Sequence, residues 1–574
     1  MNKSVKYLVL IFLAFVILKV ILSSFIVAPG PYSDGYIYLK MARSFFYNGV
    51  FDIHGVPSHQ FPPLYPMIIS VAYLFKDMQI IFFFIKLINA ILSSLIIFPA
   101  FLLAKEFLTE KKSLLFAVLI SVLPSNFSFS QYIMAENLFY PLFLFSIYFM
   151  YKSFTTKYYK YDILAGLFMG LSVLTRYIGI VLIPAFFLSC ILYFIITKRL
   201  ELKKRIVLVS MFAFIILFWI IRNGILFGFK LNGILSENQS REATLALSHT
   251  YTLESFLTLF VFYLAYYILS SGVFPFILNL TMIKNIFKKS NLSYFLIISF
   301  STILFTLLTM ANHNSGRLDR SPVSFYWFSG KIIGRYADMV LPLIFLISFI
   351  VIFLHRSNLK KMRYSVVITI LILLFSSQII FLSLLPPNNQ SLSWVGFLSI
   401  FINYIFYGRI ITERFFSWHS LIILTTLFLS LGLISAYLIK KINLNKVLSF
   451  LMIIFMLFSL SNYGYNYIYN ERYLVNNEQM KLGSWLNDYD SGKISNVLID
   501  IRDKCEDGKE DQLALYCGYL NVQTTSRLGF WLNDNIFIRN VSEMEDMDYI
   551  VSTYNLDFPI LYESGDGIYI YEIK

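Results

Sequence analysis

The chain has 574 residues, of which 58% are hydrophobic and 14% are charged, and its formal net charge is +14. Its mean hydropathy of +0.68, with apolar runs that repeatedly reach membrane-spanning length, excludes a soluble globular protein. Three cysteines in such a length exclude a disulfide scaffold. The sequence therefore predicts a mainly α-helical, polytopic membrane protein.

Apolar segments of about 20 residues set the number of expected spans. We expect about thirteen transmembrane helices, which lie near 7–27, 79–104, 113–128, 137–153, 162–177, 179–197, 206–227, 256–283, 293–311, 336–354, 365–385, 419–439 and 447–463. The first segment has too long an apolar core, and lacks a small-residue cleavage site, for a removable signal peptide. We therefore expect it to be retained as a span.

Basic residues mark alternate short connections, which is the positive-inside pattern. They include Lys3 and Lys6, Lys105, Lys111 and Lys112, Lys152, Lys157 and Lys160, Lys198 to Arg205, Lys284 to Lys289, Arg356 to Arg363, and Lys440 to Lys446. The N-terminus is thus predicted to be cytoplasmic, and the first loop (28–78) and the C-terminal tail to be extracellular. This bias explains most of the positive charge, so we do not infer nucleic-acid binding.

The first external loop is polar in otherwise apolar surroundings. Asp34 directly follows the first span, where partial desolvation raises the basicity of a carboxylate and lipid headgroups are within reach. It can also serve as the N-cap of a helix over 35–47. His59 follows in the same loop, and 63–75 is expected to form a short interfacial helix.

Charged residues recur at the predicted outer ends of the spans. Lys86 lies inside the second span, where it faces either a phosphate or, by snorkelling, the outer headgroups. Glu136 begins the fourth span, where it can alternatively stabilise the helix dipole. Cations that run against the positive-inside trend, and so suggest an anionic ligand or lipid headgroups, are Arg176, Arg222, Arg317, Arg320, Lys331 and Arg335.

The composition becomes polar near residue 465. We expect a membrane domain over 1–464 and a small external α/β domain over 465–574, with helices near 475–488 and 510–520, strands at 497–501 and 548–552, and a hairpin turning at Gly565-Asp566-Gly567. Docking or guiding of an acceptor is one hypothesis for this domain. Cys505 and Cys517 are either bridged or two buried thiols, and Cys190 fits a small apolar filler.

These features suggest one kind of chemistry. Soluble activated sugars and nucleotides are cytoplasmic, whereas the polar groups here face outward, so a group-transfer reaction would take its donor from the membrane, as a lipid phosphate. Asp34 would take the proton of an acceptor hydroxyl, and the cations would stabilise the departing phosphate. A transporter or flippase of lipid-linked sugars, or a scaffold presenting the external domain, is the alternative.

Several motifs occur in a characteristic order on the outer face: SDGYIYLKMA, FPPLYP, MAENL, LTRYIG, WIIRNGILFG and GRYADMVLP. In this order the chain resembles the GT-C glycosyltransferases, specifically the group of dolichyl-phosphate-mannose protein mannosyltransferases and lipid A aminoarabinose transferases. The resemblance covers residues 7–345 well.

The resemblance implies an enzyme that moves a monosaccharide, with inversion, from a polyprenyl (dolichyl or undecaprenyl) phosphate to a protein, lipid or glycan acceptor. It assigns the base to Asp34 and a supporting acid to Glu136. Many relatives have a basic residue before the PP of the first loop, where this chain has Phe61. Phosphate binding would then fall to Lys86, His59, Arg176, Arg222 or Arg335. No cofactor is firmly implied, although Asp34 and Glu136 could hold a divalent cation.

Overall fold

The structure is a computed structural model of the whole chain. It describes residues 3–29, 33–199, 201–230, 234, 253–318, 334–354, 365–369, 372, 444–490, 493–500, 527–539, 541, 544–565 and 567–573. The described chain forms two compact units. One comprises 1–15, 92–129 and 136–462, and the other comprises 16–91, 130–135 and 463–574. Helices α1 (Lys3–Ser24), α4 (Met78–Ser94) and α22 (Leu444–Tyr469) contribute residues to both units.

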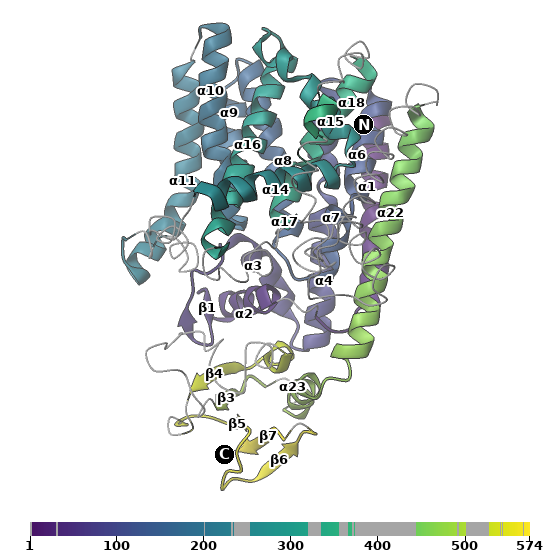
Figure 1. Ribbon diagram of the computed structural model, residues 1–574. Coiled ribbons are helices and arrows are strands. Elements are labelled where there is room, and N and C mark those ends of the chain that lie inside the picture. The colour runs from purple at the N-terminus through teal and green to yellow at the C-terminus, as the bar shows by residue number, and fades with distance from the viewer. Residues whose placement is uncertain are drawn as a thin grey trace. The chain divides into compact units, whose positions relative to one another are not determined.

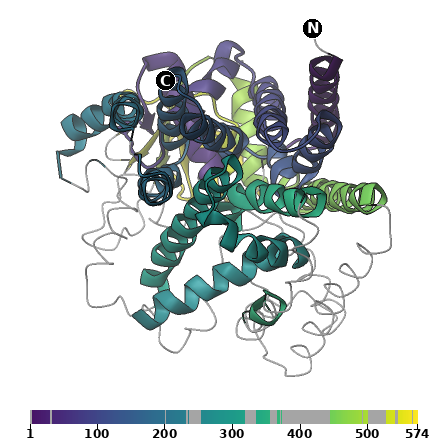
Figure 2. The same ribbon diagram turned by 90° about the horizontal axis from the view of Figure 1, so that it is seen from above.

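The first unit is helical. Its helices are α5 (Ile97–Lys105), α6 (Glu110–Val122), α7 (Pro124–Phe127), α8 (Glu136–Thr155), α9 (Lys160–Thr175), α10 (Leu182–Thr197), α11 (Leu202–Phe227), α14 (Leu253–Ser270), α15 (Phe274–Thr281), α16 (Asn291–Leu318), α17 (Gly334–Ala337) and α18 (Leu341–Leu354). Shorter 3₁₀ segments include η2 (Ser128–Gln131), η3 (Tyr177–Val181) and η5 (Asp338–Val340). Figure 2 shows several of these helices nearly end-on.

Close packing of α9 against α11 depends on two glycines one helical turn apart (Figure 1). A Cβ atom on Gly166 would lie 2.3 Å from the carbonyl oxygen of Leu208, and one on Gly170 would lie 2.7 Å from the side chain of Ile215. Small residues at this spacing let the backbones of membrane helices approach each other. The GLFMG sequence of α9 therefore fixes this pair, whose ends carry the charged residues considered below.

Among the described residues, six helices are long and apolar enough to cross a membrane, or eight if each of two bent pairs is one span. A multi-pass membrane fold is thus confirmed, whereas the number thirteen stays a prediction. Helices occupy the predicted segments except 365–385, which is described only in part, and 419–439, which lies outside the described residues.

Two predicted spans are not straight. The segment 113–128 bends by 67° between α6 and the helix that begins at Pro124, because a proline cannot continue the preceding helical hydrogen bonds. The segment 256–283 bends by 111° after α14. Its break contains Gly272 and Val273, both at positive φ. The apolar pattern alone did not reveal either bend.

The second unit contains the first loop and the C-terminal residues. It includes α2 (Ser33–Asn48), the hairpin of β1 (Asp52–Ile53) and β2 (Val56–Pro57), α3 (Leu64–Ile69), η1 (Ser70–Leu74), the π-helical turn η7 (Asn470–Leu474), α23 (Glu478–Tyr489), β3 (Asn496–Asp500), β4 (Asn535–Arg539), β5 (Tyr549–Ser552), β6 (Ile560–Glu563) and β7 (Tyr569–Glu572). The predicted helix at 63–75 is confirmed as α3 followed by η1.

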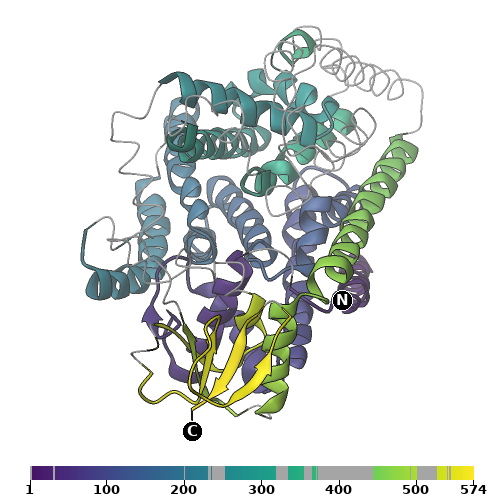
Figure 3. The same ribbon diagram turned by 60° about the horizontal axis from the view of Figure 1, so that its bottom comes forward.

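A five-stranded mixed sheet forms the core of the C-terminal part (Figure 3). Its strand order is β4-β3-β5-β7-β6, in which β3 pairs in parallel with β4 and β5, and the other pairs are antiparallel. Leu482 and Leu486 of α23 pack with Val497 and Ile499 of β3, whereas Leu498 faces a separate cluster. The small C-terminal domain is thus confirmed. Its predicted helix near 510–520, with Cys505 and Cys517, lies outside the described residues.

Candidate active site

Glu136 is the first residue of α8, as the sequence predicted. Its side chain is 1% exposed, and its carboxylate lies at the helix end where the macrodipole favours a negative charge. A buried carboxylate also needs a cationic partner to offset the cost of its desolvation. Two arginines supply that partner.

Arg176 reaches Glu136 from a tight turn between α9 and η3. The backbone leaves the helix at Arg176, with φ −148° and ψ 132°, and the N–H of Gly179 donates to the carbonyl of Arg176 at 2.9 Å. A Cβ atom on Gly179 would lie 2.9 Å from the backbone of Ser172, so the turn requires glycine. The LTRYIG motif thereby directs the Arg176 guanidinium into an ion pair with Glu136.

Arg335 approaches the same carboxylate from α17. Its Nε lies 3.8 Å from Oε1 of Glu136, and its side chain is 8% exposed. The hydroxyl of Tyr140 donates to the backbone carbonyl of Arg335 at 2.7 Å, which links α8 to α17. Three residues predicted from separate loops therefore meet in the first unit.

The ring of Tyr336 lies beneath both guanidinium groups. Its centroid is 4.9 Å from Cζ of Arg176 and 5.3 Å from Cζ of Arg335. Such stacking favours the planar guanidinium over an ammonium group. Arg176, Arg335 and Tyr336, together with Glu136, form what we call the arginine cluster.

Sequence reasoning missed a second carboxylate beside this cluster. Asp338 is 0% exposed, and its Oδ1 accepts a hydrogen bond of 2.7 Å from the hydroxyl of Tyr266. Within the described residues no hydrogen bond reaches its Oδ2. The GRYADMVLP motif contained this acid, but an acid in an apolar run gives no sign of its partner, and Tyr266 is one of 40 tyrosines.

Asp34 belongs to the second unit. It lies in the first turn of α2, which begins at Ser33, so its predicted position as the N-cap was wrong by one residue or more. Its side chain is partly exposed. The neighbouring Gly35 packs closely on the segment before α8, because a Cβ atom there would lie 3.2 Å from the carbonyl oxygen of Ile133. Whether Asp34 acts as a base stays a prediction.

Lys86 is buried, so the snorkelling interpretation was wrong. Its ammonium group donates to the carbonyls of Ser23 at 2.8 Å and Ile26 at 2.6 Å, at the C-terminal end of α1. It also lies 4.5 Å from the ring centroid of Phe82. A phosphate would have to displace or share these contacts. The sequence could not show them, because their acceptors are backbone carbonyls.

His59 and Arg222 were also predicted to bind the phosphate. His59 is half-buried in the loop between β2 and α3. Arg222, on α11, donates to the side chain of Asn223 at 3.0 Å and stacks on Trp219 at 4.7 Å. Arg320 and Lys331 lie outside the described residues.

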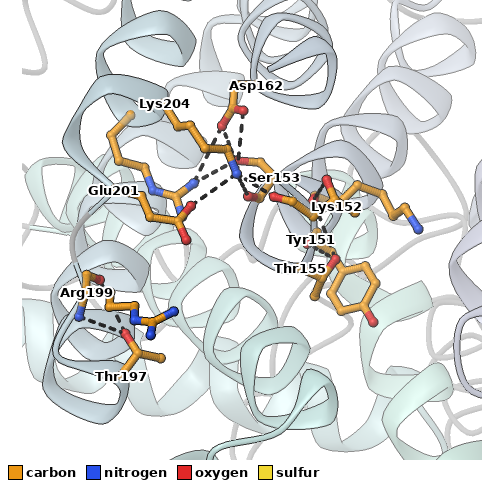
Figure 4. Close-up of polar contacts among 11 residues, drawn as sticks. Tyr151, Lys152, Ser153, Thr155, Asp162, Thr197, Arg199, Glu201 and Lys204 are labelled. Atoms are coloured by element: carbon orange, nitrogen blue, oxygen red, sulfur yellow. Dashed lines mark hydrogen bonds and ion pairs between the residues drawn. The ribbon is translucent and has the colours of Figure 1, made fainter. Parts of the chain in front are cut away.

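A second buried charge cluster lies at the opposite ends of α8 and α9 (Figure 4). Asp162 accepts from the hydroxyl of Ser153 at 2.5 Å and lies 3.8 Å from Nζ of Lys204 and 3.7 Å from Arg205. Lys204 also donates to the carbonyls of Ser153 at 2.7 Å and Thr156 at 2.6 Å. These contacts tie the end of α8 to the starts of α9 and α11. We call this group the Asp162 cluster.

Within the described part of the chain, no group of three or more His, Cys, Asp or Glu side chains is placed to hold a metal ion. Cys190 is a buried free thiol in α10.

Comparison with known proteins supports the helical architecture around these residues. Residues 60–221 match the family model described as dolichyl-phosphate-mannose-protein mannosyltransferase, a segment that contains Lys86, Glu136 and Arg176. The crystal structure of ArnT from Cupriavidus metallidurans bound to undecaprenyl phosphate aligns with a TM-score of 0.55 and 13% identity, over 98% of this chain and 97% of that chain.

The chain has the GT-C fold. The apo structure of ArnT from the same organism agrees, with a TM-score of 0.52 and 12% identity, over 99% of this chain and 98% of that chain. No curated protein sequence matches the chain. The resemblance predicted from the motifs is therefore confirmed for the GT-C architecture. At this level of identity the alignment supports the fold alone.

Proposed function

We propose that this GT-C protein is an integral membrane glycosyltransferase. It moves a monosaccharide from a polyprenyl-phosphate carrier to an acceptor hydroxyl on the outer face of the membrane, with inversion at the anomeric carbon. Asp34 is the general base. The N-terminus is cytoplasmic and the C-terminal domain is extracellular, as the positive-inside pattern predicts.

Two buried guanidinium groups that share one carboxylate carry this proposal. Arg176 and Arg335 both contact Glu136, and both stack on Tyr336. Guanidinium groups present several N–H donors in a planar fork that suits phosphate oxygens. Support also comes from ArnT, which has the same fold and whose crystal structure contains undecaprenyl phosphate.

The atoms of the proposed transfer balance without a redox partner. Asp34 accepts the proton of the acceptor hydroxyl as its oxygen forms a bond to the anomeric carbon. The bond between that carbon and the phosphate oxygen breaks, and polyprenyl phosphate departs with the electron pair. Arg176 and Arg335 stabilise the added negative charge on the leaving phosphate, and Glu136 holds their side chains in place. No general acid is required, because phosphate leaves without protonation.

The direct test uses purified protein in liposomes with undecaprenyl or dolichyl phosphate that carries a labelled sugar, and membrane extract as the acceptor source. We expect label to move from the lipid into a product, with release of polyprenyl phosphate and inverted anomeric configuration by NMR. Heat-denatured protein is the control. Label that crosses the bilayer while still attached to its lipid would instead identify a flippase, and a stationary label would reject both functions.

A further inference from the structure

The helix that carries Asp34 is held by residues from the distant C-terminal part of the same unit. Lys40 and Arg43 of α2 are 5% and 6% exposed, although each bears a long cationic side chain. Burying such groups costs several kcal/mol unless they are hydrogen-bonded. The hydrogen-bond partners of Lys40 and Arg43 therefore identify the segment that α2 binds.

Those partners lie in residues 528–535, the segment that leads into β4. Nζ of Lys40 donates to the carbonyl of Leu532 at 2.8 Å. Arg43 donates through Nε and Nη2 to the carbonyl of Asn533 at 3.1 and 2.9 Å, and through both Nη atoms to the side-chain oxygen of Asn535 at 3.2 Å. The arginine fork thus spans two residues of the turn.

The contact extends along one face of α2. Tyr36, Lys40, Arg43 and Tyr47 recur at the spacing of a single helical face. The Nδ2 of Asn533 donates to the hydroxyl of Tyr47 at 3.2 Å. At the other end, a Cβ atom on Gly529 would lie 2.4 Å from the hydroxyl of Tyr36, so the turn approaches α2 closely. Four side chains, over three helical turns, therefore face residues 528–535.

A second contact fixes the chain on the other side of Asp34. The side chain of Asn470, in η7, accepts from the N–H of Ala28 at 2.9 Å and donates to the carbonyl of Ala28 at 2.7 Å. Asn470 is 1% exposed. This two-bond pairing holds the segment between α1 and α2 at a point just before Asp34.

We propose that the C-terminal domain positions Asp34 by clamping α2 and the segment before it. The clamp consists of Lys40 and Arg43 with residues 528–535, and Asn470 with Ala28. This inference rests on the proposed function, since it gives Asp34 a task that depends on its placement. The role of the C-terminal domain, which folds against the first loop, is then to position Asp34 and not to dock an acceptor.

Two variants release the clamp at separate points. Arg43→Met keeps the apolar stem but removes the guanidinium fork, and Asn470→Leu keeps the branched shape of the side chain but removes both hydrogen bonds. In each we expect faster amide exchange in residues 33–48 and a kcat at least tenfold lower, because small displacements of a catalytic group are costly, with KM for the lipid donor changed less than threefold. Arg43→Lys should restore part of the kcat, since one ammonium can reach one acceptor.

Lys204→Met is the matched control. Lys204, like Lys40 and Arg43, is a buried cation that donates to backbone carbonyls, but it lies in the first unit. It should lower the melting temperature and leave both the kcat of the folded protein and the exchange of residues 33–48 unchanged. If all three variants lose kcat alike, or if Arg43→Met and Asn470→Leu leave that exchange or kcat unchanged, the clamp is rejected.

The exchange measurement separates this inference from the proposed function. If the wild-type protein transfers no sugar but both variants release α2, the clamp stands and the glycosyltransferase proposal fails. If the wild type transfers sugar and α2 exchange does not respond, only the clamp fails.

Discussion

The two ends of α8 and α9 carry buried charges of the same kinds in different surroundings. At one end the Asp162 cluster is closed by Ser153 and by backbone carbonyls that bind Lys204. At the other, about 25 Å away along α8, two guanidinium groups share Glu136 and lie over the partly exposed Tyr336. A lysine that binds backbone carbonyls holds helices together, whereas two planar guanidinium groups gathered at one carboxylate are suited to bind a phosphate.

Neutralising the acid of each cluster should separate these roles most clearly. Glu136→Gln should lower the rate of sugar transfer on the order of 100-fold, because the two arginines lose the charge that orders them. Asp162→Asn should leave Arg205 with an uncompensated buried charge, which costs about 3–5 kcal/mol of stability, whereas Lys204 keeps its ion pair with Glu201 at 3.2 Å. Transfer rate per folded molecule and thermal unfolding are the measurements. A lower transfer rate per folded molecule in Asp162→Asn would contradict this difference between the two clusters.

Replacing one arginine in each cluster gives a smaller effect. Arg335→Lys keeps the charge but loses the planar fork and much of the stacking on Tyr336, so the Kd for undecaprenyl phosphate should rise about tenfold. Arg205 stacks on Phe154 at 3.9 Å in the Asp162 cluster, which makes Arg205→Lys the matched control. The Kd of Arg205→Lys for undecaprenyl phosphate should equal that of the wild type. Equal Kd values for all three proteins would show that Arg335 does not bind phosphate.

Another buried acid, Asp534, should stabilise the fold in the way that Asp162 does. Burial raises its pKa to about 7, despite the N–H of Ser495 and the nearby charges of Lys40 and Arg43, and Asp490 adds to the rise. Because the folded state holds this proton more tightly than the unfolded state, the stability from this group is complete below its ordinary pKa. That stability falls as the pH rises towards 7, by about 1 kcal/mol per pH unit.

Hydrogen exchange of β4 at several pH values, corrected for intrinsic exchange rates, measures this slope. Asp534→Asn should remove it, and Asp557→Asn, which changes an exposed acid of the same domain, should retain it. A slope that persists in Asp534→Asn would assign the pH dependence to another group.

The sequence predicted those features that lie in local patterns. The lengths of the apolar runs located the helices, and the alternation of apolar residues with the turn residues located β3, β5, β6 and β7 but not β4. Charges at the span ends identified Glu136, Arg176 and Arg335 before any contact was known. The bends at Pro124 and after α14 were missed because the apolar run continues through both. The roles of Lys86, Arg43 and Asn470 were hidden because each binds backbone carbonyls or amides far away in the chain, and such partners leave no mark on the sequence.

The central claim is that the carboxylate of Asp34 is the base of sugar transfer. The most direct measurement compares the transfer rates of Asp34→Asn and Asp52→Asn, two substitutions in the same first loop, at equal amounts of folded protein. We expect the rate of Asp34→Asn to fall by at least 100-fold, with undecaprenyl phosphate binding retained and Asp52→Asn within twofold of the wild type. An Asp34→Asn protein that transfers sugar at the wild-type rate would contradict the account.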